Sequence, residues 1–178
     1  MPILGTIASS QTSVTPGMFF INSTTLGSNQ NGVTLNDFGG YDDLVIHYLA
    51  RASVDTSDTE IVVNNTTGSN YPIKLHYSTS TGFNGESFNT TNSWPRTGYS
   101  AYNSSEANFY GTNQIYLPRY TSNSYKTIIW YGAGRYGSDI QDATGLGLWQ
   151  NTASITSLVM NGTWATGTQF WVYGIKKS

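Results

Sequence analysis

The sequence offers few residues that could carry acid–base or hydrolytic chemistry. Its two histidines, His47 and His76, both fall in the middle of segments that read as strands, where an ordinary sheet residue also stands. A general acid or base needs a partner group that orients it, and a glycosidase needs two carboxylates facing each other across a groove. Most of the Asp and Glu residues lie in segments of turn composition, and no Gly-x-Ser-x-Gly nucleophile motif is present. We therefore predict that the protein is not an enzyme, with no catalytic residue and no cofactor.

The stretch GAGRYG, residues 132–137, matches the Gly-x-Gly-x-x-Gly pattern of dinucleotide-binding turns. That site requires a helix to begin at the glycines, because the amides at the helix N-terminus hold the pyrophosphate. The residues that follow, SDIQDATGLGLW, contain two further glycines and no helical face. We interpret residues 132–137 as a glycine-rich turn between two strands.

The stretch DTSDTE, residues 55–60, gathers three carboxylates and several hydroxyls. Hard cations such as Ca²⁺ prefer oxygen ligands of this kind. The stretch lacks the glycine and the ligand spacing of an EF-hand loop, and it lies between two expected strands. A polar turn is the favoured interpretation and no metal site is predicted, although cation binding by residues 55–60 stays an open alternative.

Residues 78–112 form the best candidate for a binding surface. This segment is rich in Ser, Asn and Gly, yet it carries several large aromatic residues, among them Trp94, Tyr99, Tyr102 and Tyr110. Rigid aromatic rings give large contact areas, and small polar residues add adaptable hydrogen bonds. The four rings are candidates for a platform that binds sugar rings or a protein partner. The alternative, which we favour, is that they pack a satellite core or a subunit interface.

The composition indicates one folded domain with an unusually uncharged surface. Charged residues make up 10% of the 178 residues, apolar residues 38% and aromatic residues 14%. The net charge of −2 leaves no basic stripe for phosphates, so we expect no nucleic-acid binding. The chain has no cysteine, which excludes disulfides and thiolate metal sites. No apolar run reaches membrane-spanning length, and the start MPILGTIASSQTS lacks the basic segment of a secretory signal.

Short segments of strand character separated by Gly, Asn and Ser clusters predict an all-β protein. In the segment 42–52, both alternating sets of side chains are largely apolar, which suits a strand covered on both faces. We expect a single-domain antiparallel β-sandwich, jelly-roll-like in topology, because at least eight short strands and no helical periodicity occur. The expected strands lie within residues 42–52, 60–65, 71–77, 114–118, 125–132, 145–150, 154–160 and 168–175.

The ends of the chain carry further apolar residues. Residues 1–20 are either an arm that docks on a neighbouring subunit, with Ile3, Leu4 and Ile7 as its contacts, or a strand added to the protein's own sheet. Residues 21–178 would form the sandwich, with residues 78–112 as a variable aromatic and polar insertion. The closing run GTQFWVYGIKKS stays apolar almost to the last residue, and a chain end frays unless it is tied down. We expect it to be an integral strand.

Five blocks of sequence, taken in order, resemble a loosely defined group of small structural proteins of tailed bacteriophages, found in phages of cyanobacteria and other aquatic bacteria. The match is poorest in residues 78–112. The blocks are MPILGTIASS, YDDLVIHYLARA with the following DTSDTEIVVNNTTGSNYPI, IYLPRYTSNSYKTIIWYGAG, GLGLWQNTASITSLVM and GTQFWVYGIKKS.

The resemblance implies a jelly-roll-like virion protein on the outer surface of a capsid or tail, assembled in the host cytoplasm. It also implies that both faces of the C-terminal strand are covered. We expect a capsid decoration (cement) protein that binds the major capsid protein or other virion proteins. A homo-oligomer is expected, which we take to be a trimer. The alternative is a tail-associated module, as on a tail fibre, that serves host recognition by binding surface glycans. The resemblance brings no catalytic residues with it.

Overall fold

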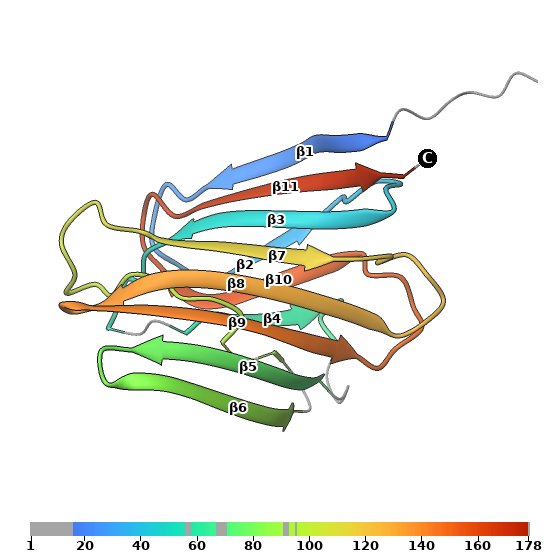
Figure 1. Ribbon diagram of the computed structural model, residues 1–178. Helices are drawn as coiled ribbons and strands as arrows, with labels where there is room; N and C mark the ends of the chain where they lie inside the picture. The colour runs from blue at the N-terminus through green and yellow to red at the C-terminus, as the bar shows by residue number, and fades with distance from the viewer. Residues whose placement is uncertain (1–15, 56–57, 67–70, 91–92, 95, 178) are drawn as a thin grey trace, which may run out of the picture.

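The computed structural model describes residues 16–55, 58–66, 71–90, 93–94 and 96–177. Its eleven strands form two antiparallel sheets that pack face to face, and the described residues contain no helix (Figure 1). The three-stranded sheet contains β2 (Gln30–Asn36), β10 (Ser157–Trp164) and β4 (Glu60–Val63), in that order. The eight-stranded sheet contains, in order, β1 (Gly17–Thr25), β11 (Gln169–Lys176), β3 (Asp43–Ala50), β7 (Gly111–Leu117), β8 (Lys126–Tyr136), β9 (Asp139–Trp149), β5 (Tyr71–Thr79) and β6 (Gly82–Thr90).

The connections between the sheets are those of a jelly roll. Strands β1 to β4 alternate between the large and the small sheet, and β10 and β11 do so again. The small sheet is extended beyond β4 by the described residues of the segment 93–99. There the Trp94 N–H donates to the Ile61 carbonyl oxygen at 2.9 Å, and the Trp94 carbonyl oxygen accepts a hydrogen bond from the Ile61 N–H at 3.1 Å. The predicted all-β, jelly-roll-like sandwich is confirmed. Strands β8, β9, β5 and β6 are additional to the jelly roll and extend the large sheet past β7.

The core lies between the two sheets and follows the alternation in the sequence. In β3, Leu44, Ile46, Tyr48 and Ala50 point inward and are at most 1% exposed. The rings of Tyr48 and Phe170 stack there, with centroids 5.5 Å apart. Burial of such side chains supplies the main driving force for this fold, at roughly 25 cal/mol per Å² of apolar surface.

Two glycines of β9 make room for two tryptophan rings of the core. A Cβ atom on Gly145 would lie 2.5 Å from the Trp130 ring, and one on Gly147 would lie 2.5 Å from the indole nitrogen of Trp94. The inner side of β9 is therefore bare backbone at both positions. The sequence GLGLW, residues 145–149, is thus part of a strand. Its glycines contact the ring of Trp130 on β8 and the ring of Trp94.

The C-terminal segment is an interior strand, as expected. Strand β11 lies between β1 and β3. Asp43 on β3 bonds to Lys177, the residue that follows β11. The buried Asp43 carboxylate accepts hydrogen bonds from Lys177 Nζ at 2.9 Å, from Tyr116 Oη at 2.5 Å and from the Arg119 N–H at 2.9 Å. Burial raises the pKa of Asp43, but the hydrogen bonds from Lys177, Tyr116 and Arg119 outweigh it, so the pKa lies below its ordinary value of 3.8.

Three strands lie outside the eight expected segments: β1, β2 and β6. Because β1 begins at Gly17, residues 17–20 belong to the protein's own sheet and not to an arm. The predicted glycine-rich turn at residues 132–137 is wrong for most of its length. Residues 132–136 complete β8, and only Gly137, at φ 57°, begins the turn into β9.

Candidate docking face

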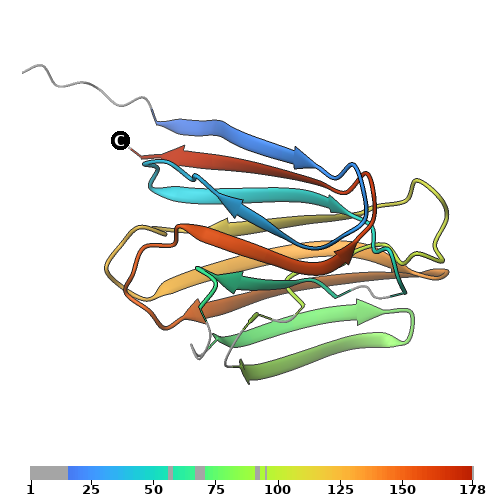
Figure 2. The ribbon, with the colours of Figure 1, turned by 180° about the vertical axis from the view of Figure 1, so that it is seen from behind.

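The outer face of the eight-stranded sheet has no layer of protein over it in the described structure. The small sheet covers the inner face only, as opposite views of the molecule show (Figures 1 and 2). Side chains that alternate with the core residues therefore face outward across the whole sheet. A sheet solvated on one face usually carries polar residues there, so the composition of this face is informative.

Two rows of outward side chains cross the central strands in register. We call these two rows the docking face. The first row runs through paired positions on β1, β11, β3, β7, β8 and β9: Phe20, Tyr173, Val45, Tyr116, Ile129 and Leu146. The exposed Lys74 of β5 pairs with Leu146 and bounds this row. The second row, two residues along, runs from β11 to β5: Trp171, His47, Gln114, Tyr131, Thr144 and His76.

The first row of the docking face is largely apolar, and the second row mixes aromatic rings with polar side chains. Six of the twelve side chains are exposed, whereas Val45 is buried. Phe20, Ile129, Tyr131 and Leu146 are between 46% and 58% exposed. With strands about 4.8 Å apart and about 7 Å between rows, two rows over six strands cover about 400 Å². Exposed apolar patches of several hundred Å² mark interaction surfaces. This face is therefore the leading candidate for a functional site.

Hydrogen bonds and ring contacts hold the polar groups of the docking face in place. The Tyr131 hydroxyl donates to Gln114 Oε1 at 2.9 Å, and the His47 ring meets Tyr173 edge to face at 5.8 Å between centroids. Burial lowers the pKa of His47, so that this side chain is neutral at pH 7. Burial and the bond to Asp43 raise the pKa of Tyr116 to about 12. Neither His47 nor Tyr116 therefore adds a charge to the face at pH 7.

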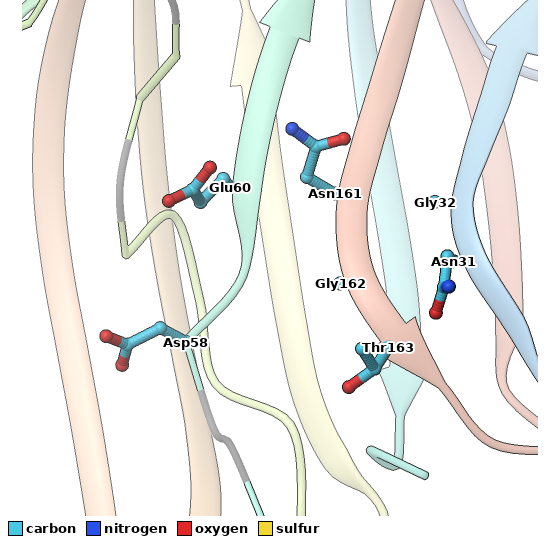
Figure 3. A pocket seen from close by; sticks show the side chains of 7 residues that line it. All are labelled: Asn31, Gly32, Asp58, Glu60, Asn161, Gly162 and Thr163. Atoms are coloured by element: carbon cyan, nitrogen blue, oxygen red, sulfur yellow. The ribbon is translucent and has the colours of Figure 1, made fainter. Parts of the chain in front are cut away.

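A second feature is a polar hollow of about 540 Å³ on the opposite side of the molecule (Figure 3). It is lined by Asn31 and Gly32 of β2, by Asn161, Gly162 and Thr163 of β10, and by Asp58 and Glu60 at the start of β4. The register of β10 against β2 shifts between Met160 and Thr163, so the strands separate where the two glycines carry no side chain. The hollow offers amide and carboxylate groups without an exposed ring.

The carboxylates of the hollow already have protein partners. Asp58 pairs with Arg96 Nε at 3.1 Å, and Arg96 also reaches Glu86 at 2.8 Å. Glu60 accepts a hydrogen bond from Ser93 Oγ at 3.2 Å. Among the described residues, no group of three or more acidic or histidine side chains is placed to hold a metal ion. The described residues of the stretch 55–60 form no such group.

The candidate rings of residues 78–112 do not form an exposed platform. Trp94 and Tyr99 are 0% and 3% exposed, and Trp94 meets the Tyr71 ring at 5.0 Å between centroids. Tyr102 and Tyr110 are half-buried, and the Tyr110 hydroxyl donates to the Thr166 carbonyl at 3.2 Å. The reason is that residues 93–99 pair with β4, which turns Trp94 and Tyr99 inward. These two rings pack the core, as the alternative interpretation states.

The loop that follows is organised by one arginine. Arg51 donates hydrogen bonds of 2.8–3.2 Å to the carbonyl oxygens of Asn103, Ser105, Glu106 and Phe109. The loop 102–110 is therefore ordered, although it lies at the end of the sheet. The other predicted contacts, Ile3, Leu4 and Ile7, lie outside the described residues.

The docking face was not identified from the sequence, although its signal was there. Both alternating sets of side chains are largely apolar in 42–52, which suited a strand covered on both faces, and the resemblance implied the same for the C-terminal strand. Within one chain the outer face of β11 is not covered, and Trp171 and Tyr173 are only partly buried. One sheet face is covered by the small sheet, and the other is free.

Comparison of the chain with protein-family models, with curated proteins and with solved structures finds no match. Within the described residues no helix has the length and apolarity needed to cross a membrane. The docking face and the sequence resemblance are therefore the two features that bear on function.

Proposed function

We propose that the protein is a structural, non-enzymatic component of the outer surface of a tailed-phage particle, a capsid decoration protein that binds the capsid lattice through the docking face. The observation that carries the proposal is the uncovered outer face of the eight-stranded sheet, on which the largely apolar first row of the docking face crosses six strands. The resemblance of five sequence blocks to virion proteins supports the same conclusion.

The docking face suits a lattice partner for physical reasons. A sheet face is broad and rigid, so binding orders few side chains that were not ordered before. Its aromatic residues match the enrichment of Tyr, Trp and Phe at interfaces, and the lack of charge avoids the cost of desolvating ions. In a symmetric array, modest contacts of many copies add up to firm attachment.

The number of copies per particle tests the proposal directly. A decoration protein follows the lattice, so we expect its count in purified virions to be a simple ratio of the count of the major capsid subunit. Quantitative mass spectrometry with isotope-labelled peptides from both proteins gives this ratio. A count of a few copies up to a few dozen per particle would place the protein on the tail or at a vertex and contradict a decoration role.

The docking face is tested by a charge placed in its centre. Ile129 is 46% exposed, so we expect Ile129→Lys to fold with a free energy of unfolding within about 0.5 kcal/mol of the natural protein. Burying the new ammonium group against a partner should weaken binding to particles at least about tenfold. The measurement is co-sedimentation of purified variant with particles that lack the protein.

A matched variant carries the same charge elsewhere. Thr34 of β2 is exposed on the outer side of the small sheet, between the buried Val33 and Leu35. Thr34→Lys should bind particles as the natural protein does. Equal binding of the Ile129→Lys variant would rule out the docking face as the contact surface.

Host-glycan recognition by a tail-associated protein is the second candidate. The observation that favours it is the polar hollow, whose Asn31 and Asn161 amides can donate to and accept from sugar hydroxyls. The glycan site of this candidate would be the polar hollow on the small sheet, and not the aromatic segment 78–112. A count of a few copies up to a few dozen per particle, which contradicts a decoration role, would favour this candidate.

A further inference from the structure

Strand β1 forms a free edge of the eight-stranded sheet. In the part of the chain that the structure describes, β1 pairs with β11 on one side and with no strand on the other. Free edges present unpaired N–H and C=O groups, and proteins normally protect them with charged residues, proline, bulges or short strands. Strand β1 has nine residues and none of them is charged. Its one protective feature is the bulge between Phe20 and Asn22.

The side chains of this edge are apolar and exposed. Met18, Phe19 and Phe20 are 58%, 40% and 58% exposed. The other sheet edges differ. Strand β6 exposes one large apolar residue, Phe83, but contains two glycines and Glu86, which pairs with Arg96. Strand β4 is covered by the segment 93–99. Strand β2 contains Gly32 at φ 76° and exposes no large apolar residue. The features that invite pairing therefore concentrate on β1.

We propose that β1 pairs antiparallel with β1 of a second copy of this chain, so that two large sheets join edge to edge across a two-fold axis. A strand of this composition is complementary to itself, because antiparallel self-pairing opposes no like charges. The contact uses the same surface on both copies, so it is satisfied in a dimer and does not propagate to further copies. It gives a dimer, in place of the trimer expected from the sequence.

The geometry also connects the two docking faces. Antiparallel pairing across a two-fold axis perpendicular to the sheet leaves the outer faces of both copies on the same side. The first row of the docking face ends at Phe20 on β1, so the row would continue into the partner. An edge about 30 Å long on a sheet layer about 10 Å thick presents about 300 Å², which is less than the roughly 800 Å² per partner of a standard interface. We therefore expect a dimer that dissociates in the micromolar range.

Sedimentation equilibrium of the purified protein tests the proposal without any particle. We expect a concentration-dependent mass that rises to twice the 19.4 kDa of one chain and no further. Phe20→Lys places two like charges near the axis and should weaken the dimer at least about tenfold. The matched variant is Phe83→Lys on β6, where Phe83 is 72% exposed, and it should dimerise normally. A monomer up to the hundred-micromolar range would overturn the proposal, and so would larger assemblies that Phe83→Lys also dissolves.

Single cysteines provide a second readout that does not depend on the lysine variants. The chain has no cysteine, so one introduced cysteine can form a disulfide only between two copies. Opposed residues of an antiparallel pair lie within disulfide reach. We expect at least one of Phe20→Cys, Asn22→Cys and Ser23→Cys to give covalent dimers under mild oxidation, while Phe83→Cys does not. Absence of crosslinks at all three β1 positions would overturn the proposed pairing. Failure of this test leaves particle binding through the docking face unaffected, because neither measurement contains particles.

Discussion

The Trp94→Ala variant should lose about 3–5 kcal/mol of its free energy of unfolding, the range found when a buried aromatic side chain is truncated. Trp94 is fully buried, and its ring fills the space above Gly147 and meets the Tyr71 ring. Neighbouring side chains cannot fill the vacated volume, because Gly147 has no side chain and Tyr71 is held in β5. Urea denaturation followed by circular dichroism measures the loss.

The control is a tryptophan of the docking face. Trp171 lies on the outer side of β11 and is only partly buried, so Trp171→Ala should cost clearly less stability. The comparison also separates two roles of Trp94. If its ring were a ligand platform, Trp94→Ala would abolish binding and leave the unfolding curve unchanged. Such a result would contradict the structural role described above.

The Asp43→Ala variant should be destabilised by about 2–4 kcal/mol. The substitution removes the acceptor of three hydrogen bonds and leaves the Tyr116 hydroxyl and the Arg119 N–H, both partly buried, without their partner. It also removes the ion pair with Lys177 Nζ at the end of β11, where the Lys177 N–H keeps its hydrogen bond to Asp42. Denaturation at pH 7 measures the total, and hydrogen exchange should show faster exchange in β11 than in β9.

The charge of Asp43 has a separate signature in acid. Its folded-state pKa lies below 3.8, so the folded protein binds this proton less readily than the unfolded chain does. The corresponding stability is present above pH 4 and is lost as the pH falls through the folded-state pKa. Asp43→Asn keeps the shape of the side chain and removes this titration. The stability difference between the natural protein and Asp43→Asn should therefore shrink between pH 5 and pH 2, and a constant difference would contradict the assignment.

The strands that sequence analysis identified are those with a strong and regular contrast between side chains. Leu44, Ile46 and Tyr48 in β3 recur at every second position, and one face of β3 is buried against the small sheet. Strand β1 has no such contrast, because it lies at an edge and most of its side chains are exposed. Strand β6 contains two glycines and several small polar residues, a composition that is typical of turns. The local pattern of apolar and polar side chains is therefore least informative for edge strands.

The candidate sites were harder to predict than the fold because they depend on long-range pairing. The composition around Trp94 is that of a loop, and its burial follows from the pairing of residues 93–99 with β4. The docking face depends on which of two apolar faces the small sheet covers. Alternation in β8 shows that Ile129 and Trp130 point to opposite sides, but it does not say which side is free. The sheet order decides that, and it is not a local property.

The contacts between glycines and aromatic rings have a consequence for how this sequence can diverge. Gly145 lies against Trp130, Gly147 against Trp94 and Gly174 against Tyr41, so each glycine leaves no room for a methyl group while its ring is present. For Gly174 the three nearest atoms all belong to Tyr41, so a descendant that replaced this ring by a small residue would be free to change the glycine as well. Gly145 and Gly147 are held more firmly, because a Cβ atom there would also lie 2.8 Å from the Lys74 carbonyl oxygen and 2.9 Å from the Ile128 side chain. We therefore expect positions 41 and 174 to change together, and positions 145 and 147 to stay glycine even where a ring is lost.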